Sequence, residues 1–148
     1  MQERPAKQTE MDGWRFDTAG PEAIRADVLD AFPYEHRGKE IHLELETDEF
    51  TSVCPWSGLP DFGRLRVRYV PDALCLELKS FKYYLFSYRH VGIYYEHLVP
   101  RILEDIRARV DPFCIVVEGE FRERGGIGSR ARAEYCRPGW QPQGPLVL

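Results

Sequence analysis

The stretch Leu74-Cys-Leu-Glu-Leu-Lys-Ser-Phe-Lys-Tyr-Tyr84 decides the fold that we expect for this chain. In its first half leucines alternate with Cys75, Glu77 and Lys79, which is the pattern of a strand with two different faces. From Ser80 the alternation stops and apolar residues recur at helical spacing. A helix start offers unpaired N–H groups to a polar ligand, but a sheet edge with solvated charges has the same pattern. Both interpretations of this strand-to-helix corner stay open here.

Size and composition indicate an ordinary globular protein. The 148 residues are enough for one domain with a core, so we expect residues 1–148 to form a single domain, with residues 1–19 as a loose arm. No apolar run approaches the roughly 20 residues that span a bilayer, and no apolar segment of a secretory signal follows the first residues. We therefore expect a cytoplasmic protein.

Charge argues against a protein whose main partner is nucleic acid. The net charge is −4, although residues 122–137 carry five arginines against two glutamates. This arginine-rich block could meet an anionic partner, but a solvated strand that carries arginines is the commoner explanation.

The cysteines show no pattern of a metal site. Cys54, Cys75, Cys114 and Cys136 form no CxxC pair and no cluster with histidine, so we expect no zinc site. In a reducing compartment we also expect no disulfide. Cys75 and Cys114 lie within apolar strand patterns and are expected to fill the core.

The order of the expected elements predicts an α+β fold. Alternating patterns predict strands over residues 40–50, 64–70, 74–79, 113–121 and 130–136. Helical spacing predicts helices over residues 21–32, 80–87 and 93–110, the last with a kink or restart at Pro100. Strands 64–70 and 74–79 are expected to form an antiparallel hairpin. The result is an antiparallel β-sheet with helices on one face, whose open edges favour oligomerisation.

One loop carries a possible nucleophile. Cys54 begins a segment punctuated by Pro55, Gly58 and Pro60, and Asp61 lies at its far end. If the loop folds back, a thiol and a proton donor face one pocket, which is the minimal apparatus for covalent addition. The alternative is that Cys54 has no role and that Asp61 caps a turn.

A second carboxylate lies near the start of the long helix. Glu96 could accept two hydrogen bonds from a guanine-like ligand, but a carboxylate in a first helical turn is also expected from the helix dipole alone. The histidines have no spacing that indicates a metal site or a triad, so we assign them no catalytic role. They are His36, His42, His90 and His97.

Several motifs together resemble one family. The segment Glu77-Leu-Lys-Ser-Phe-Lys-Tyr-Tyr84 is similar to the signature of the QueF family, the NADPH-dependent 7-cyano-7-deazaguanine reductases. Residues 50–62 resemble the nucleophile loop of that family, with the cysteine and the aspartate at the same separation. Residues 84–89 and 124–127 are also similar to family segments, so that the likeness covers roughly residues 30–139. The resemblance implies the tunnelling fold (T-fold) in its short, single-module form.

The resemblance also implies a reaction. The family reduces a nitrile to a primary amine, giving 7-aminomethyl-7-deazaguanine for the queuosine of tRNA, and consumes two NADPH without a metal. Addition of a thiolate turns the nitrile into a thioimide, which is a better hydride acceptor. The carry-over makes Cys54 the nucleophile that forms the thioimide and Asp61 the proton donor.

Binding residues are carried over in the same way. For the substrate the resemblance implies Leu76, Glu77, Leu78, Tyr95 and Glu96. For the phosphates of NADPH it implies Lys79, Lys82, Arg124, Gly125 and Gly126. It further implies a homo-oligomer with ligand sites between subunits, for instance two stacked pentamers.

One position departs from the family pattern, and two other classes of function stay open. The family often has His-Glu where this chain has Tyr95-Glu96, so the role of that histidine does not transfer to Tyr95. A T-fold purine- or pterin-binding protein without reductase activity, or a hydrolase of that fold, is the alternative function. An RNA-binding module built on residues 122–137 is a third class, which the net charge disfavours.

Overall fold

The computed structural model describes residues 13–145. Its strands are β1 (Ala31–Pro33), β2 (Leu43–Val53), β3 (Pro60–Val70), β4 (Leu74–Leu76), β5 (Cys114–Arg124) and β6 (Ile127–Cys136). Its helices are α2 (Leu78–Phe86) and α3 (Tyr95–Val110), preceded by the 3₁₀ turns η1 (Pro21–Ala23) and η2 (Ala26–Val28). No helix within the described residues has the length and apolar character needed to cross a membrane.

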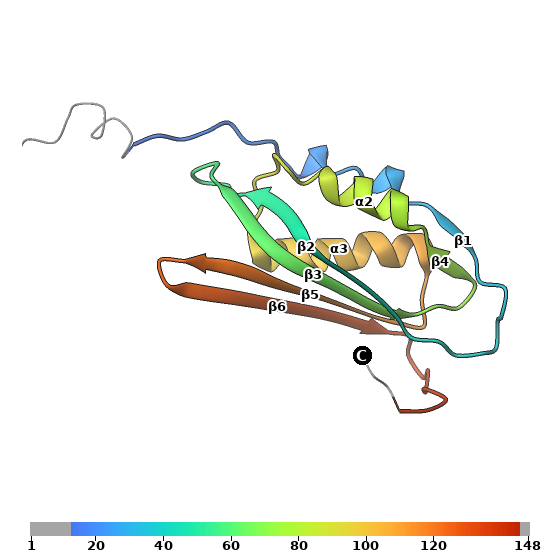
Figure 1. The fold of residues 1–148 in the computed structure, drawn as a ribbon. Coiled ribbons are helices and arrows are strands. Elements are labelled where there is room, and N and C mark those ends of the chain that lie inside the picture. Colours follow the sequence, from blue (N-terminus) through green and yellow to red (C-terminus); the bar gives the residue numbers. More distant parts are fainter. Residues whose placement is uncertain (1–12, 146–148) are drawn as a thin grey trace, which may run out of the picture.

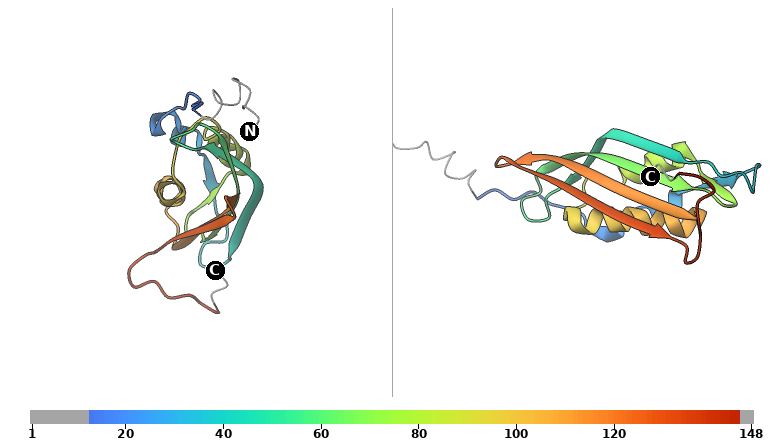
Figure 2. Two further views of the ribbon diagram at one scale, coloured as in Figure 1. Left: turned by 90° about the vertical axis from the view of Figure 1, so that its left-hand side faces the viewer. Right: turned by 90° about the horizontal axis from the view of Figure 1, so that it is seen from below.

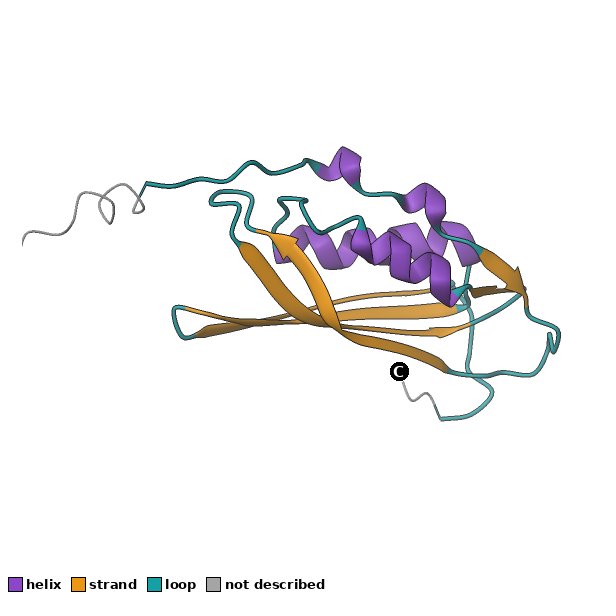
Figure 3. Cartoon of the chain, turned by 45° about the horizontal axis from the view of Figure 1, so that its top comes forward, coloured by secondary structure: helices purple, strands orange, loops and turns teal. Residues whose placement is uncertain are grey.

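A four-stranded antiparallel sheet of order β2-β3-β5-β6 forms the body of the protein (Figure 1). Helices α2 and α3 lie on one face of this sheet, as Figure 3 shows. The expected α+β architecture with an antiparallel sheet and two helices on one face is confirmed. Strands β2 and β6 are the two edges of the sheet.

The core lies between the sheet and α3, which Figure 2 shows end-on beside the strands. Val67 in the middle of β3 pairs with Leu45 on one side and Val117 on the other, and Val67 is fully buried. The predicted apolar stripe of α3 is confirmed. Its buried residues are Leu98, Val99, Ile102, Leu103, Ile106 and Val110. The helix runs through Pro100 without a break, because the carbonyl that loses its partner there is that of Glu96 in the exposed first turn.

The face of the sheet without helices carries ion pairs. Arg66 bonds Glu46 at 2.7 Å and Arg132 bonds Glu118 at 2.7 Å, each across neighbouring strands. Arg130 pairs with Glu120 in the same way. The arginine-rich block of residues 122–137 therefore contributes to a solvated, internally paired surface, as the commoner explanation predicts.

The prediction of a helix over residues 21–32 is wrong. The chain makes two short 3₁₀ turns there and then the strand β1. Two serines of the α2 region explain the difference, because the N–H of Arg25 donates to Ser87 Oγ and the N–H of Asp30 donates to Ser80 Oγ. These backbone donors would otherwise bond carbonyls within a helix.

The hairpin expected between residues 64–70 and 74–79 is also wrong. Both sides of β3 are already occupied, by β2 and β5, so β4 leaves the sheet and pairs with β1. Strand β4 ends at Leu76 because the Glu77 side chain accepts hydrogen bonds from the N–H groups of Lys79 and Ser80, both at 2.7 Å, and starts α2. The predicted passage from strand to helix is confirmed two residues earlier than expected.

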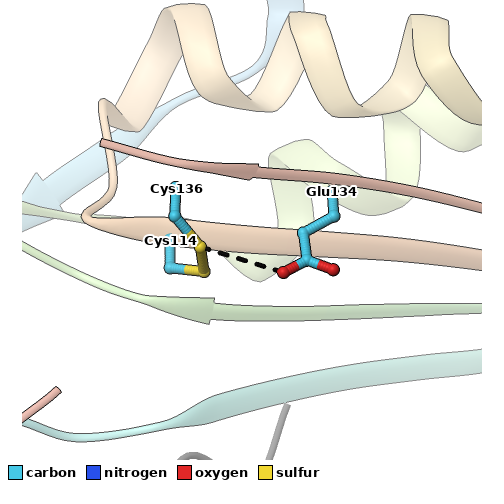
Figure 4. A group of neighbouring side chains, drawn as sticks. All are labelled: Cys114, Glu134 and Cys136. Carbon is cyan, nitrogen blue, oxygen red and sulfur yellow. Dashed lines mark hydrogen bonds between the residues drawn. A yellow bond between two sulfur atoms is a disulfide. The ribbon is translucent and has the colours of Figure 1, made fainter. Parts of the chain in front are cut away.

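Two of the cysteines are joined, so the expectation of no disulfide is wrong. Cys114 and Cys136 are direct partners in the β5–β6 register, and their sulfur atoms form a bond (Figure 4). Glu134 lies beside them, and its carboxylate oxygen is within 4.8 Å of both sulfurs. With the sulfurs bonded to each other, this group offers a cation one carboxylate and no thiolate. Cys75 is buried, as expected.

The N-terminal segment is bonded to the rest of the chain from Phe16 onward. The N–H of Phe16 donates to the carbonyl of Ser57 at 2.9 Å, and Ala19 forms a bridge with Val91. The expectation of a loose arm over residues 1–19 is therefore wrong for residues 16–19, and residues 1–12 lie outside the described part of the chain.

Candidate active site

A tight turn at the end of β2 presents Cys54. The N–H of Cys54 donates to the carbonyl of Leu59 at 2.9 Å, and the N–H of Gly58 donates to the carbonyl of Cys54 at 2.8 Å. Gly58 has a φ of 74°, a left-handed conformation that favours glycine. The loop expected between Cys54 and Asp61 is thus reduced to a turn between two strands, and it leaves Cys54 half-buried.

The surroundings of Cys54 favour its thiolate. Burial alone raises the pKa of the thiol, but hydrogen bonds from the Ser57 hydroxyl and from the N–H groups of Ser57 and Trp56, together with the Arg124 guanidinium, lower it to about 7. Donors beside a sulfur stabilise negative charge there, so Cys54 ionises at a lower pH than an ordinary thiol.

Asp61 lies next to this turn at the start of β3. It pairs in register with Ser52 of β2, and its side chain is buried. Within the described residues, Asp61 Oδ1 and Ser52 Oγ receive no aligned hydrogen bond, although the guanidinium of Arg124 forms an ion pair with that Oδ1. A carboxylate that is buried beside a half-buried thiol is suited to exchange a proton with that thiol or with a ligand.

Arg124 and Tyr95 complete the cluster from two further elements. Arg124 ends β5 and contacts both the Cys54 sulfur and the Asp61 carboxylate. Tyr95 is the first residue of α3, and its ring stacks on Phe121 with centroids 3.7 Å apart. Burial first, and then a hydrogen bond to Asp61, raise the pKa of the Tyr95 phenol, which therefore stays protonated and donates to the carboxylate.

Backbone pairing brings these elements together. The N–H of Val53 donates to the carbonyl of Val91 at 3.1 Å, and the N–H of Ile93 donates to the carbonyl of Val53 at 3.3 Å. The segment that leads into α3 therefore runs beside the end of β2. As a result Tyr95 and the exposed Glu96 belong to the same end of the molecule as Cys54.

The predicted NADPH residues are divided between two places. Gly125 and Gly126 form the β5–β6 turn with φ of 56° and 79°, and in the described part of the chain no atom outside the turn lies within 4 Å of either Cβ position. This open turn follows Arg124 directly. Lys79 and Lys82 lie instead on exposed positions of α2, and Lys82 lines a groove of about 510 Å³ between α2 and β2.

The strand-to-helix corner and Cys54 lie at opposite ends of the sheet. The N–H of Leu76 donates to the Tyr69 hydroxyl at 2.9 Å, and Tyr69 follows Asp61 by eight residues of β3, which corresponds to roughly 25 Å. Figure 1 shows β4 and the turn between β2 and β3 at opposite ends of the sheet. The chain therefore does not bring Leu76, Glu77 and Leu78 together with Cys54 and Glu96.

Sequence reasoning missed two parts of the site. Ser57 supplies two donors to the sulfur, and its position three residues after a cysteine in a turn rich in proline and glycine is the signal that could have found it. The contact of Arg124 with the thiol was not visible, because it depends on the register of β5 against β3.

The fold and this cluster define a class, an α+β protein of the T-fold type with a half-buried cysteine of lowered thiol pKa at one end of its sheet. The family model described as QueF-like protein matches residues 60–140. The chain is 52% identical to the NADPH-dependent 7-cyano-7-deazaguanine reductase of Caldicellulosiruptor bescii, over 82% of this chain and 92% of that relative. It is 45% identical to the protein of that name from Syntrophus aciditrophicus, over 85% of this chain and 90% of the relative.

A solved structure agrees with these relatives. The apo crystal structure of the archaeosine synthase QueF-Like superposes with a TM-score of 0.56 at 29% identity, over 64% of this chain and 91% of that one. The chain belongs to the QueF family.

Proposed function

We propose that this protein is an NADPH-dependent 7-cyano-7-deazaguanine reductase that makes 7-aminomethyl-7-deazaguanine for queuosine biosynthesis. The names of the relatives support the reaction. The observation in this chain that carries the proposal is the contact of one arginine, Arg124, with both a half-buried cysteine and a buried aspartate.

In this proposal Cys54 attacks and Asp61 protonates. The thiol proton of Cys54 passes to the Asp61 carboxylate and the thiolate forms a bond to the nitrile carbon. One π bond of the nitrile breaks, and the nitrogen takes that proton from Asp61 to give a thioimide. Tyr95 and Arg124 hold the aspartate in place. Glu96, which lies at the same end of the molecule as Cys54, accepts hydrogen bonds from the amino and ring N–H groups of the deazaguanine.

NADPH supplies one hydride in each of two successive two-electron reductions, so that a nitrile, two NADPH and two protons yield an amine and two NADP⁺. The residues of the chain fit this co-substrate, because Lys79 and Lys82 are exposed cations and the Gly125–Gly126 turn leaves space for a phosphate. The proposal includes no metal and places the enzyme in the cytoplasm.

Two measurements test the reaction. Protein, 7-cyano-7-deazaguanine and NADPH are mixed, and the absorbance of the cofactor is followed; a folded protein that leaves NADPH unconsumed contradicts the proposal. With the nitrile alone, intact-protein mass spectrometry is expected to detect a covalent adduct that Cys54→Ala abolishes. An adduct that survives this substitution assigns the attack to another cysteine.

Asp61 has its own test. Asp61→Asn is expected to bind the substrate and to slow turnover by about 10²- to 10⁴-fold, because the amide cannot deliver a proton. Turnover at the wild-type rate would remove Asp61 from the mechanism.

We further propose that two copies of the chain build each site, as part of a homo-oligomer. This accounts for the separation of the Glu77 corner from Cys54 within one chain, and the open edges β2 and β6 offer backbone groups to neighbouring copies. Coexpression of Cys54→Ala with Glu77→Ala, each inactive alone, is expected to restore part of the activity, because some sites receive both intact residues. No recovery in mixed oligomers contradicts a shared site.

A further inference from the structure

The N-terminal segment contacts the two residues that hold the Cys54 thiol. The N–H of Phe16 donates to the carbonyl of Ser57 at 2.9 Å. The guanidinium of Arg15 lies over the ring of Trp56, 3.2 Å from its centroid. The N–H groups of Trp56 and Ser57, with the Ser57 hydroxyl, are the donors that lower the pKa of the Cys54 thiol. The segment is therefore separated from the nucleophile only by Trp56 and Ser57.

A second set of contacts fixes the same segment. The N–H of Ala19 donates to the carbonyl of His90 at 2.7 Å, and the N–H of Gly92 donates to the carbonyl of Ala19 at 2.9 Å. Val91 is bonded on its other side to Val53, the residue before Cys54. The N-terminal segment, residues 90–93 and the end of β2 thus run side by side and parallel.

Packing at two glycines shows how closely the segment approaches. A Cβ on Gly58, inside the turn, would lie 2.5 Å from the carbonyl oxygen of Phe16. A Cβ on Gly92 would lie 2.9 Å from the Cα of Pro55 and 3.1 Å from Thr18 Oγ1. The backbone of the segment is therefore in van der Waals contact with the turn and cannot shift toward it.

The turn itself has little packing to hold its shape. Trp56 is 67% exposed, and Leu59 is 51% exposed. Hydrogen bonds to a charged sulfur are effective only while the donors stay aligned with it. A short exposed turn that is closed mainly by its own backbone bonds would lose part of this alignment without outside contacts.

We propose that Arg15 and Phe16 are positioning residues, which hold Trp56 and Ser57 so that their donors stay directed at the Cys54 sulfur and set the reactivity of the nucleophile. This inference rests on the proposed role of Cys54 and gives the N-terminal segment a function in the same site. Arg15 acts through the ring of Trp56, and Phe16 acts through its own backbone N–H.

A pair of substitutions at one position tests the backbone contact. Phe16→Pro removes the N–H that Ser57 accepts, whereas Phe16→Ala keeps it and removes only the half-exposed ring. The readout is the rate at which iodoacetamide alkylates Cys54 across a pH series, followed by peptide mass spectrometry. We expect Phe16→Pro to slow alkylation at neutral pH by about 3- to 10-fold, because the thiolate loses aligned donors. We also expect the midpoint of the dependence of the alkylation rate on pH to move to higher pH. Phe16→Ala is expected to stay within about twofold of wild type.

Arg15→Ala provides a second variant that leaves the backbone intact, since its side chain is exposed. It is expected to move the midpoint in the same direction by a smaller amount. Wild-type midpoints in folded Phe16→Pro and Arg15→Ala overturn the inference, and so do equal shifts in Phe16→Pro and Phe16→Ala. If Phe16→Pro does not fold, the Arg15→Ala midpoint decides. Alkylation needs neither nitrile nor NADPH, so failure of the proposed reaction and failure of this inference are separate results.

Discussion

The ring of Tyr95 lies flat against the ring of Phe121, with centroids 3.7 Å apart and planes inclined by 6°. This stack joins the first residue of α3 to β5 and directs the phenol at Asp61. By the family resemblance, histidine is expected at this position in many relatives. A phenol with a raised pKa keeps its proton around neutral pH and can donate to a carboxylate there, whereas an imidazole changes its charge near neutrality.

The hydroxyl of Tyr95 is therefore expected to orient Asp61. Tyr95→Phe keeps the stack and removes the donor, so we predict a fall in kcat of about 10- to 100-fold with a KM for the nitrile within about threefold of wild type. Steady-state NADPH oxidation measures both constants. Thermal unfolding is the control, because Tyr95→Phe should melt close to wild type. An unchanged kcat would mean that the Tyr95 hydroxyl does not orient Asp61 for catalysis.

Arg124 has two possible roles, which one substitution separates. In Arg124→Gln the buried Asp61 loses its cationic partner and Cys54 loses a donor, so we predict slower formation of the nitrile adduct in the absence of NADPH, by about tenfold. The adduct is followed by mass spectrometry over time. If Arg124 binds only a phosphate of NADPH, adduct formation will match wild type and only the KM for NADPH will rise.

Much of the fold and part of this cluster could be predicted from the sequence. Alternation located the long strands, and α3 was visible as an apolar stripe, because both patterns are local. The helix predicted over residues 21–32 does not form for a non-local reason, since Ser80 and Ser87 accept hydrogen bonds from backbone N–H groups of that segment. In the same way the contact of Arg124 with Cys54 and Asp61 depends on strand register. Cys54 and Asp61 could be named only because their loop resembles a family pattern.

The pH dependence of the nucleophile has a definite sign. The hydrogen bonds around Cys54 lower the pKa of its thiol to about 7, so the thiolate fraction grows as pH rises through 7. We predict that the rate of alkylation of Cys54 increases about tenfold per pH unit well below 7 and levels off above it. Since the folded pKa lies below the ordinary value, wild type should also gain stability relative to Cys54→Ala as pH rises from 7. An alkylation midpoint at the ordinary thiol value would contradict the role of these donors.

Glu77 has a structural task in addition to its proposed contact with substrate. Its carboxylate accepts hydrogen bonds from the N–H groups of Lys79 and Ser80 at the start of α2. We predict that Glu77→Ala lowers the free energy of unfolding by about 0.5–2 kcal/mol, and that Glu77→Asp restores most of this loss because aspartate is a favourable cap. Urea denaturation measures both variants. If Glu77→Asp recovers stability but not activity, the carboxylate must also reach the ligand, and equal recovery of both would assign Glu77 to the cap alone.

The bond between Cys114 and Cys136 is expected to make stability depend on the redox state. It closes a segment with a sequence separation of 22 residues, for which chain entropy gives about 3 kcal/mol. Protein purified without reductant should therefore show two titratable thiols after denaturation, those of Cys54 and Cys75, and four after reduction, with a lower midpoint in urea. Cys136→Ala is the matched control, because its midpoint should not respond to reductant. Four thiols in the untreated protein would mean that the pair is open in solution, and the edge strand β6 would then be held by its ladder to β5 without a covalent link.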